Sequence, residues 1–346
     1  MNPSSATRPL LWPLVPVYRF GLALRELQLR SGLKPVRRLK WPVISIGNLS
    51  TGGAGKTPLT IALAKALTAR GMHVDVLSRG YGRQSALPQL VDPGGTAQDF
   101  GDEPLVIARE ANVPVYVAAE RYQAGLLAER SAPAQPKAPQ DAEENPRLKA
   151  HILDDGFQHR QLARDIDILL LSRRDLADHL LPAGNLREPL HAAERAQVIA
   201  IPADEPDVET EIKARGWKAQ IWRVRRRIEI PNVDSSSRGP VAAFCGIARP
   251  DQFFQGLESA GVKLAARIAF ADHHNYTAAD LARIESVARA AGATAVLTTE
   301  KDRVRLGALA ATVSATLPIQ TVALRIEIED EKAAIDWLTH SLKDPA

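Results

Sequence analysis

The chain has 346 residues, enough for two domains or one large one, and 45% of them are hydrophobic, which can supply extended cores. Its single cysteine, Cys245, excludes an internal disulfide and suits a reducing compartment, and no cysteine–histidine spacing is typical of a zinc site. The net charge of +4 is uneven, because the first 40 residues contribute +7 and the remainder sums to −3. The basic character therefore belongs to the N-terminus.

Residues 1–33 form a basic amphipathic segment. Beyond Pro16, apolar side chains recur at helical spacing, at Val17, Phe20, Leu24 and Leu27. With Trp12 nearby, such a helix is typical of an interfacial anchor on an anionic membrane surface. The alternatives are a helix packed on its own domain and a basic arm for nucleic acid, and the aromatic and leucine content disfavours the arm. We expect no nucleic acid partner.

Residues 47–58, Gly-Asn-Leu-Ser-Thr-Gly-Gly-Ala-Gly-Lys-Thr-Pro, are the most informative stretch. They follow an apolar, strand-like run at 43–46 and precede a helix predicted over 59–70. Strand, glycine loop and helix N-terminus are the parts of a phosphate cradle, in which backbone N–H groups wrap the phosphates of a nucleotide. Lys56 would reach the β- and γ-phosphates, and the Thr57 hydroxyl would ligate Mg²⁺.

The loop departs from the pattern G-x-x-x-x-G-K-[ST] in one place, because Ser50 stands where the first glycine is expected. The alternative is a glycine-rich turn that happens to carry Lys-Thr, which the flanking strand and helix disfavour. We therefore predict nucleotide binding by the following residues: Thr51, Gly52, Gly53, Ala54, Gly55, Lys56, Thr57 and Pro58.

Apolar runs then alternate with helical stretches. We predict strands at 73–77, 113–117, 150–153, 166–171 and 197–201, and helices at 104–111 and 119–130. This alternation predicts a P-loop NTPase-like α/β fold, with a parallel sheet, helices on both faces and ligands at the carboxyl ends of the strands. Residues 131–147 contain four prolines and are predicted to be a mobile surface insertion.

The second half of the chain predicts a smaller α/β domain. Residues 219–230 and 319–328 roughly alternate apolar and charged side chains, which predicts two strands that each have one solvent-exposed face. The two strands could pair as a linker. Between them we predict strands at 241–245 and 294–298 and helices at 251–260 and 277–291. The expected division is a membrane-associating segment at 1–33, a P-loop domain at 34–216, a linker at 217–239 and 317–330, a smaller domain at 240–316, and a C-terminal helix and tail at 331–346.

Carboxylates stand at the ends of two of these elements. Asp154 and Asp155 end an apolar strand, where a carboxylate can hold Mg²⁺ directly or through water; the alternative is an Asp-Gly turn, which does not need two repelling acids. Asp102 and Glu103 open the helix at 104–111, where a helix cap is an equal alternative for Asp102. After the strand at 73–77, Arg79 could meet phosphate and Tyr81 could stack on a base.

Taken in order, these motifs resemble the tetraacyldisaccharide 4′-kinase family of lipid A biosynthesis. The matching stretches are 47–58, 78–82, 101–104, 154–158, 185–188, 270–273 and 299–302, which together span most of the chain. The resemblance implies an ATP- and Mg²⁺-dependent transfer of the γ-phosphoryl group to the 4′-hydroxyl of tetraacyldisaccharide 1-phosphate, giving lipid IVA. It also implies a peripheral protein on the cytoplasmic face of the bacterial inner membrane, with no obligate protein partner.

The resemblance further implies roles for individual residues. It points to Asp102 as the general base, supported by His273 from the second domain; His274 is the alternative imidazole. Lys56 would hold ATP, and the predicted metal environment is Thr57, Asp155 and Glu103. Asp154 and Arg187 would complete the catalytic site, with Glu188 nearby.

Two other classes of protein share parts of this pattern. A membrane-cycling regulatory ATPase would use a phosphate loop and an amphipathic helix, but it would not need the Asp-His pair of the second domain. A soluble small-molecule kinase would not need the N-terminal anchor.

Overall fold

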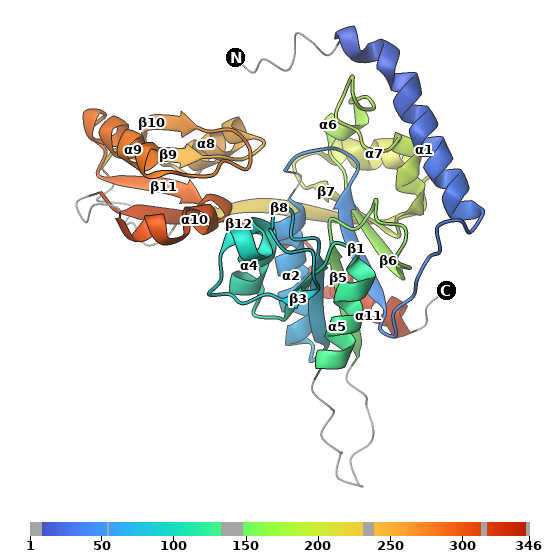
Figure 1. Ribbon diagram of the computed structural model, residues 1–346. Helices are drawn as coiled ribbons and strands as arrows, with labels where there is room; N and C mark the ends of the chain where they lie inside the picture. Colours follow the sequence, from blue (N-terminus) through green and yellow to red (C-terminus); the bar gives the residue numbers. More distant parts are fainter. Residues whose placement is uncertain (1–8, 54, 133–147, 231–238, 313–316, 344–346) are drawn as a thin grey trace.

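The computed structural model describes residues 9–53, 55–132, 148–230, 239–312 and 317–343 (Figure 1). Ala54 of the glycine loop lies outside the described residues, and so does nearly all of the insertion predicted at 131–147. Within the described residues, the strands hydrogen-bond into one twelve-stranded sheet in the order β10-β9-β11-β12-β8-β7-β6-β1-β5-β2-β4-β3.

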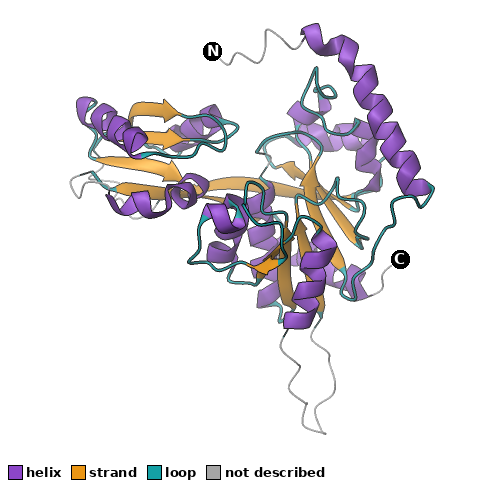
Figure 2. Cartoon of the chain, in the orientation of Figure 1, coloured by secondary structure: helices purple, strands orange, loops and turns teal. Residues whose placement is uncertain are grey.

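The strands of the sheet have the following bounds: β1 Val43–Asn48, β2 His73–Ser78, β3 Gln89–Leu90, β4 Val115–Val117, β5 Lys149–Asp154, β6 Ile166–Leu170, β7 Val198–Pro202, β8 Gln220–Glu229, β9 Val241–Cys245, β10 Leu264–Ala269, β11 Ala295–Thr299 and β12 Ile319–Ile328. From β8 to β4 every neighbouring pair is parallel, and β3 is an antiparallel edge strand. Helices lie on both faces (Figure 2). The predicted fold class is confirmed.

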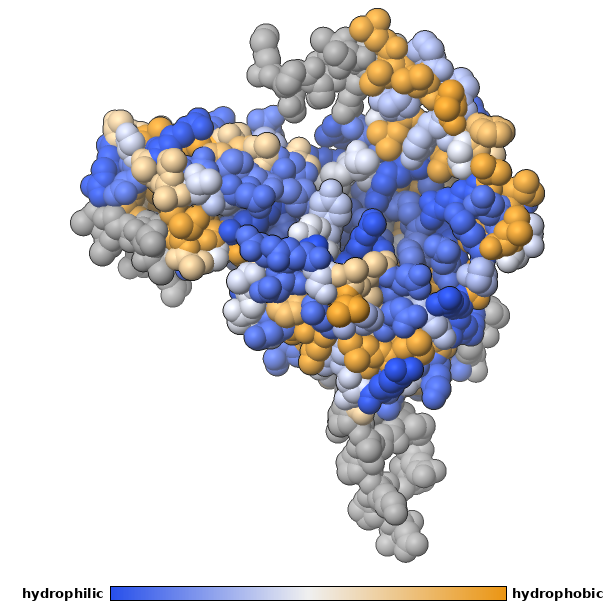
Figure 3. Space-filling view, in the orientation of Figure 1, coloured by the Kyte–Doolittle hydropathy of each residue, from blue (hydrophilic) through white to orange (hydrophobic). Residues whose placement is uncertain are grey.

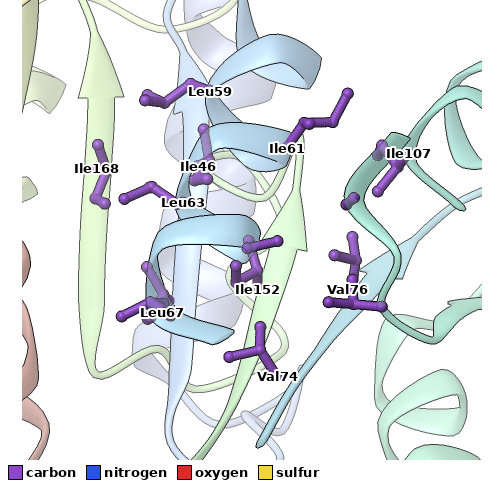
Figure 4. Packing of buried hydrophobic residues seen from close by; sticks show 14 of the residues in the cluster. Ile46, Leu59, Ile61, Leu63, Leu67, Val74, Val76, Ile107, Ile152 and Ile168 are labelled. Carbon is purple, nitrogen blue, oxygen red and sulfur yellow. The ribbon is translucent and has the colours of Figure 1, made fainter. Parts of the chain in front are cut away.

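The helices of the larger unit are α1 Val15–Arg30, α2 Lys56–Ala69, α3 Ala97–Phe100, α4 Asp102–Ala111, α5 Arg121–Ser131, α6 Arg173–Leu176, α7 Pro206–Ala214 and α11 Glu331–Lys343, with 3₁₀ turns η1 Pro9–Leu14 and η2 Leu190–Arg195. α2 buries Leu59, Leu63 and Leu67, which are spaced four residues apart and so share one helix face. They pack against Ile46 and Ile152 of the central strands (Figure 4). This core fixes the N-terminus of α2 at the carboxyl end of β1.

The smaller unit contains β9, β10 and β11 with α8 Pro250–Ser259, α9 Ala278–Ala290, α10 Glu300–Leu306 and the 3₁₀ turn η3 Gly307–Thr312. The sequence did not predict β10, because this edge strand consists largely of alanines and shows no strong apolar alternation. It did not predict α7 or the two-turn α10 either. The Thr299 side chain caps α10 by accepting the backbone N–H of Asp302.

Two long strands join the units. β8 and β12 pair antiparallel from Ala323–Glu229 to Ile328–Val224, as the alternating pattern predicted. β8 also pairs with β7 of the larger unit, and β12 pairs with β11 of the smaller one. The two strands therefore belong to both units at once, and the sheet runs continuously through the molecule (Figure 1).

A buried charged cluster ties the entry of β1 to α5, far from the glycine loop. His151 on β5 lies beside Asp75 on β2, with Nδ1 2.7 Å from Oδ1, and its Nε2 is 3.6 Å from Glu129 on α5. Glu129 accepts the backbone N–H groups of Lys40 and Trp41, and the Trp41 ring stacks on His151. Burial alone would lower the pKa of His151, but the two carboxylates outweigh burial and raise that pKa to about 9.

This cluster predicts a stability loss in alkali. The pKa of His151 is higher in the folded chain than the unfolded value of 6.5, so its stabilisation is complete below pH 6.5 and disappears as the pH rises through 9. We expect the free energy of unfolding to fall by about 3 kcal/mol over this interval from His151 alone. Urea denaturation of His151→Gln should show a flatter profile, whereas His340→Gln, at an exposed position, should follow the wild type. Parallel profiles for all three proteins would contradict the assignment.

Candidate active site

The glycine loop has the geometry of a phosphate cradle. β1 ends at Asn48 and α2 begins at Lys56, so the loop connects the carboxyl end of a central strand to a helix N-terminus. Gly52 and Gly55 have φ of 95° and 96°, a left-handed conformation that a side chain would strain. Thr57 is buried in the first turn of α2, followed by Pro58, while Thr51 and Gly53 are exposed.

A buried amide holds two cations beside this loop. Asn48 Oδ1 accepts a hydrogen bond from Lys56 Nζ at 3.0 Å and another from the Arg187 guanidinium at 2.6 Å. Arg187 also donates to both carboxylate oxygens of Asp155, at 3.0 and 3.1 Å, and Lys56 lies 3.5 Å from the same carboxylate. We predicted no role for Asn48. It lies within the stretch 47–58 that carries the family resemblance, but nothing in that pattern pointed to its side chain.

The paired aspartates face the loop and differ in charge balance. Burial disfavours ionisation of Asp155, but Lys56 and Arg187 outweigh it and lower its pKa to about 2. Asp154 is fully buried, accepts a hydrogen bond from the Thr60 hydroxyl at 3.1 Å, and has its pKa raised by burial and by the charges of Glu103 and Asp155. Asp154 is thus a buried carboxylate beside the loop whose negative charge is incompletely compensated.

Asp102 and His273 meet across the two units. Asp102 is the first residue of α4 rather than its cap, since Gly101 occupies the cap position. Its Oδ2 lies 3.4 Å from His273 Nδ1 and accepts Nε of Arg305 from α10 at 2.8 Å. Burial opposes ionisation of Asp102, but the hydrogen bond to His273 and the charge of Arg305 hold its pKa well below the usual range.

The neighbours of this pair are also placed by the structure. His274 bonds to Asp280 at 3.1 Å, which favours His273 as the imidazole of the site. Glu103 forms an ion pair with Lys301 of α10. Tyr81 is exposed, with its ring 5.2 Å from that of His273.

The structure also places two further predicted residues, Arg79 and Glu188. Arg79 is exposed, and its charge, together with burial, lowers the pKa of Arg121 to about 10. Glu188 is buried and pairs with Arg195 at 2.7 Å, away from the Asp155 carboxylate that its neighbour Arg187 binds. Glu188 therefore supports the chain around Arg187.

A cleft of about 690 Å³ opens beside the glycine loop, between the units. It is lined by the chain that follows β6 and β7, by β8 and β12, and by α8, and it includes the guanidinium groups of Arg226 and Arg249. A Cβ atom at Gly52 would lie 3.6 Å from Arg249 Nε, and one at Gly55 would lie 3.8 Å from Arg226 Nε. The Arg226 and Arg249 side chains therefore lie between the cleft and the glycine loop.

One side of this site can hold a nucleotide by its phosphates, and the other presents a carboxylate and an imidazole that can accept a proton from an alcohol. Fold and site together define a P-loop kinase. The chain belongs to the tetraacyldisaccharide-1-P 4′-kinase (LpxK) family, whose model matches residues 7–343. This confirms the predicted family and favours a kinase over the regulatory ATPase.

Individual relatives agree with the family assignment. The chain is 41% identical to the tetraacyldisaccharide 4′-kinase of Koribacter versatilis over 331 residues, which cover 94% of this chain and 96% of the relative. It is 40% identical to that of Rhodopseudomonas palustris over 340 residues, covering 95% and 91%. The crystal structure of LpxK from Aquifex aeolicus in complex with ATP superimposes with a TM-score of 0.70 at 29% identity, covering 96% of this chain and 98% of that one.

Gly47, near the end of β1, and Gly53, in the glycine loop, should differ sharply in how much an alanine substitution destabilises the protein. A Cβ at Gly47 would lie 2.5 Å from Phe157 Cβ and 2.9 Å from its backbone nitrogen, whereas a Cβ at Gly53 would have no atom within 4 Å. We expect Gly47→Ala to lower the free energy of unfolding by about 1–3 kcal/mol, because the chain that carries the aspartates must move. Gly53→Ala should change it by less than about 0.5 kcal/mol. Equal effects in urea denaturation would refute this packing argument.

Proposed function

We propose that this protein transfers the γ-phosphoryl group of ATP to the 4′-hydroxyl of tetraacyldisaccharide 1-phosphate, giving lipid IVA. Membership in the tetraacyldisaccharide-1-P 4′-kinase family supports the substrate and the reaction. The observation that carries the proposal in this chain is the Asp102–His273 pair, because a nucleotide switch without an acceptor does not need a proton acceptor supplied by a second unit.

The nucleotide is held from two sides in this proposal. Lys56 and the backbone N–H groups at the start of α2 bind the phosphates. Arg187 is held beside Lys56, because both side chains donate to Asn48 Oδ1. The rest of the nucleotide extends into the adjoining cleft, where Arg226 and Arg249 line the wall. The related LpxK of Aquifex aeolicus, crystallised with ATP, supports this nucleotide.

The residues around the loop fit a magnesium ion. Mg²⁺ is usually bound by one or two carboxylates together with substrate phosphates and water, so a cage of three acids is not required. Asp155 is already paired with Lys56 and Arg187, whereas Asp154 is a buried carboxylate with incompletely compensated charge. We therefore propose Asp154 and the Thr57 hydroxyl as direct ligands, with Asp155 and Glu103 in the surrounding shell. The ion would neutralise charge that develops on the transferred group.

In this proposal Asp102 and His273 activate the acceptor hydroxyl. A sugar hydroxyl is a poor nucleophile, and its proton must leave as the phosphoryl group arrives. The Asp102 side chain is 5% exposed and that of His273 is 42% exposed, so the imidazole forms the accessible side of the pair. We propose that the pair accepts the proton as a unit, with the ionised Asp102 carboxylate as the base and the His273 imidazole supporting it.

The decisive experiment follows phosphoryl transfer from γ-labelled ATP to tetraacyldisaccharide 1-phosphate in detergent micelles. We expect a labelled lipid product with the wild type, and turnover lower by about 10²- to 10⁴-fold in Asp102→Ala with ATP affinity little changed. Lys56→Ala should lose ATP binding as well. Asp92→Ala, at an exposed position, serves as the control. Free phosphate without labelled lipid would indicate the regulatory ATPase instead.

The N-terminal helix supports a position at the membrane surface. α1 buries none of its side chains, and Val17, Phe20 and Leu27 are 67%, 71% and 62% exposed. Figure 3 shows this apolar stripe along the helix. The opposite face contacts the site, since the Tyr18 hydroxyl donates to the backbone carbonyl of Arg187 at 2.9 Å. Among the described residues, no helix has the length and apolar content needed to cross a bilayer.

We infer that α1 lies in the cytoplasmic interface of the inner membrane, on anionic lipid. An acylated substrate favours this arrangement, because each CH₂ group brought into water costs about 0.8 kcal/mol. The basic residues that flank the apolar stripe suit anionic headgroups.

The apolar stripe gives a further prediction. Phe20→Glu combined with Leu27→Glu should abolish flotation with anionic vesicles and lower turnover of the lipid substrate, while ATP binding measured without vesicles stays unchanged. Leu87→Glu is the matched control, because Leu87 is 70% exposed and lies outside α1. If both proteins float equally well, α1 is not the anchor.

A further inference from the structure

Arg305 reaches from the smaller unit into the site and touches both members of the proposed base pair. Its side chain is only 5% exposed. The guanidinium donates to Asp102 Oδ2 through Nε at 2.8 Å and also through an Nη atom, and this second nitrogen lies 3.2 Å from His273 Nδ1. No motif marked Arg305, because the residue it binds lies 203 positions earlier in the chain.

A rigid frame within the smaller unit fixes the direction of this guanidinium. Its remaining Nη donates to the Gly246 carbonyl at 2.5 Å and to Asp302 Oδ1 at 3.3 Å. Asp302 is fully buried and in turn accepts the Gly246 N–H at 3.0 Å and the Tyr276 hydroxyl at 2.9 Å. One Nη of the planar guanidinium is therefore held within the smaller unit, and the edge formed by Nε and the other Nη faces Asp102.

Asp102 and His273 need such an intermediary. They come from different units, and their closest approach of 3.4 Å is long for a strong hydrogen bond. We infer that Arg305 is a positioning residue that holds the Asp102 carboxylate and the His273 ring in the relative orientation required for proton removal. This inference rests on the proposed function, because it concerns the same pair.

A simpler role would be to tie the two units together. Other pairs already do so, since Lys301 binds Glu103 and Arg325 binds Glu110 at 2.6 Å. Of these three cations, Arg305 is the one that contacts the Asp102–His273 pair. A tie would affect stability and the binding of both substrates, whereas a positioning residue would affect turnover.

Steady-state kinetics of the full-length protein separates these roles. We expect kcat to fall by more than about tenfold in Arg305→Gln and by a smaller factor, still above about twofold, in Arg305→Lys, while the KM values for ATP and lipid stay within about twofold of the wild type. Arg303→Gln, at an exposed position of the same helix, should leave both unchanged. If Arg305→Gln does not fold, Arg305→Lys decides the question. A folded variant with kcat within about twofold of the wild type overturns the inference.

A double-mutant cycle with Asp102→Asn tests whether Arg305 acts through the carboxylate. We expect Arg305→Lys to have no further effect on kcat in the Asp102→Asn background. Equal losses in both backgrounds would overturn the positioning role while leaving the proposed base intact. Normal turnover of Asp102→Asn alone would instead refute the base assignment, so the two failures are distinguishable.

Discussion

The antiparallel pairing of β8 with β12 is the constraint on which the rest of the structure depends. β8 extends the parallel strands of the larger unit beside β7, and β12 extends those of the smaller unit beside β11, within one sheet. The smaller unit consequently cannot shift along the larger one without breaking a ladder. This fixes α10, which follows β11 directly, against α4 of the larger unit. The acids at the start of α4 and the basic residues of α10 are neighbours because of that ladder.

Charge is arranged asymmetrically at this contact. α4 contributes the acids Asp102, Glu103 and Glu110, and the other side contributes Arg305, Lys301 and Arg325. Removing such charges from water is costly, and a buried ion pair often adds little net stability. The ion pairs are better understood as contacts that orient the two units relative to each other. In the proposed function they align two units around a carboxylate that must be ionised before it can accept a proton, and the helix N-terminus at Asp102 favours that charge state.

The sequence predicted the parts of the site whose residues are consecutive in the chain or lie at the ends of neighbouring strands. A strand, a glycine loop, Lys56-Thr57 and a helix are consecutive, so the cradle could be placed from residues 43–70 alone. The aspartates at the end of β5 were placed equally well, because carboxyl ends of parallel strands meet at one edge. Arg305 and Asn48 could not be found this way. Their roles arise from partners that are distant in sequence, and periodicity carries no information about such contacts. β10 was not predicted, because its alanines produce no clear alternation of apolar and polar side chains from which a strand could be recognised.

The N-terminal helix connects the chemistry to the location of the substrate. Its outward face is apolar, while Tyr18, Arg25 and Glu26 on the other face contact Arg187, Gln158 and Arg160. Gln158 in turn donates to the Asn48 carbonyl, next to the phosphate cradle. Because α1 has no buried side chains, these polar contacts carry its attachment to the larger unit. A surface that covers the apolar face would therefore stabilise the helix and, through it, the chain segments that hold Arg187 and Asp155. In the proposed arrangement, the same few hydrogen bonds would link membrane contact to the order of the phosphate site.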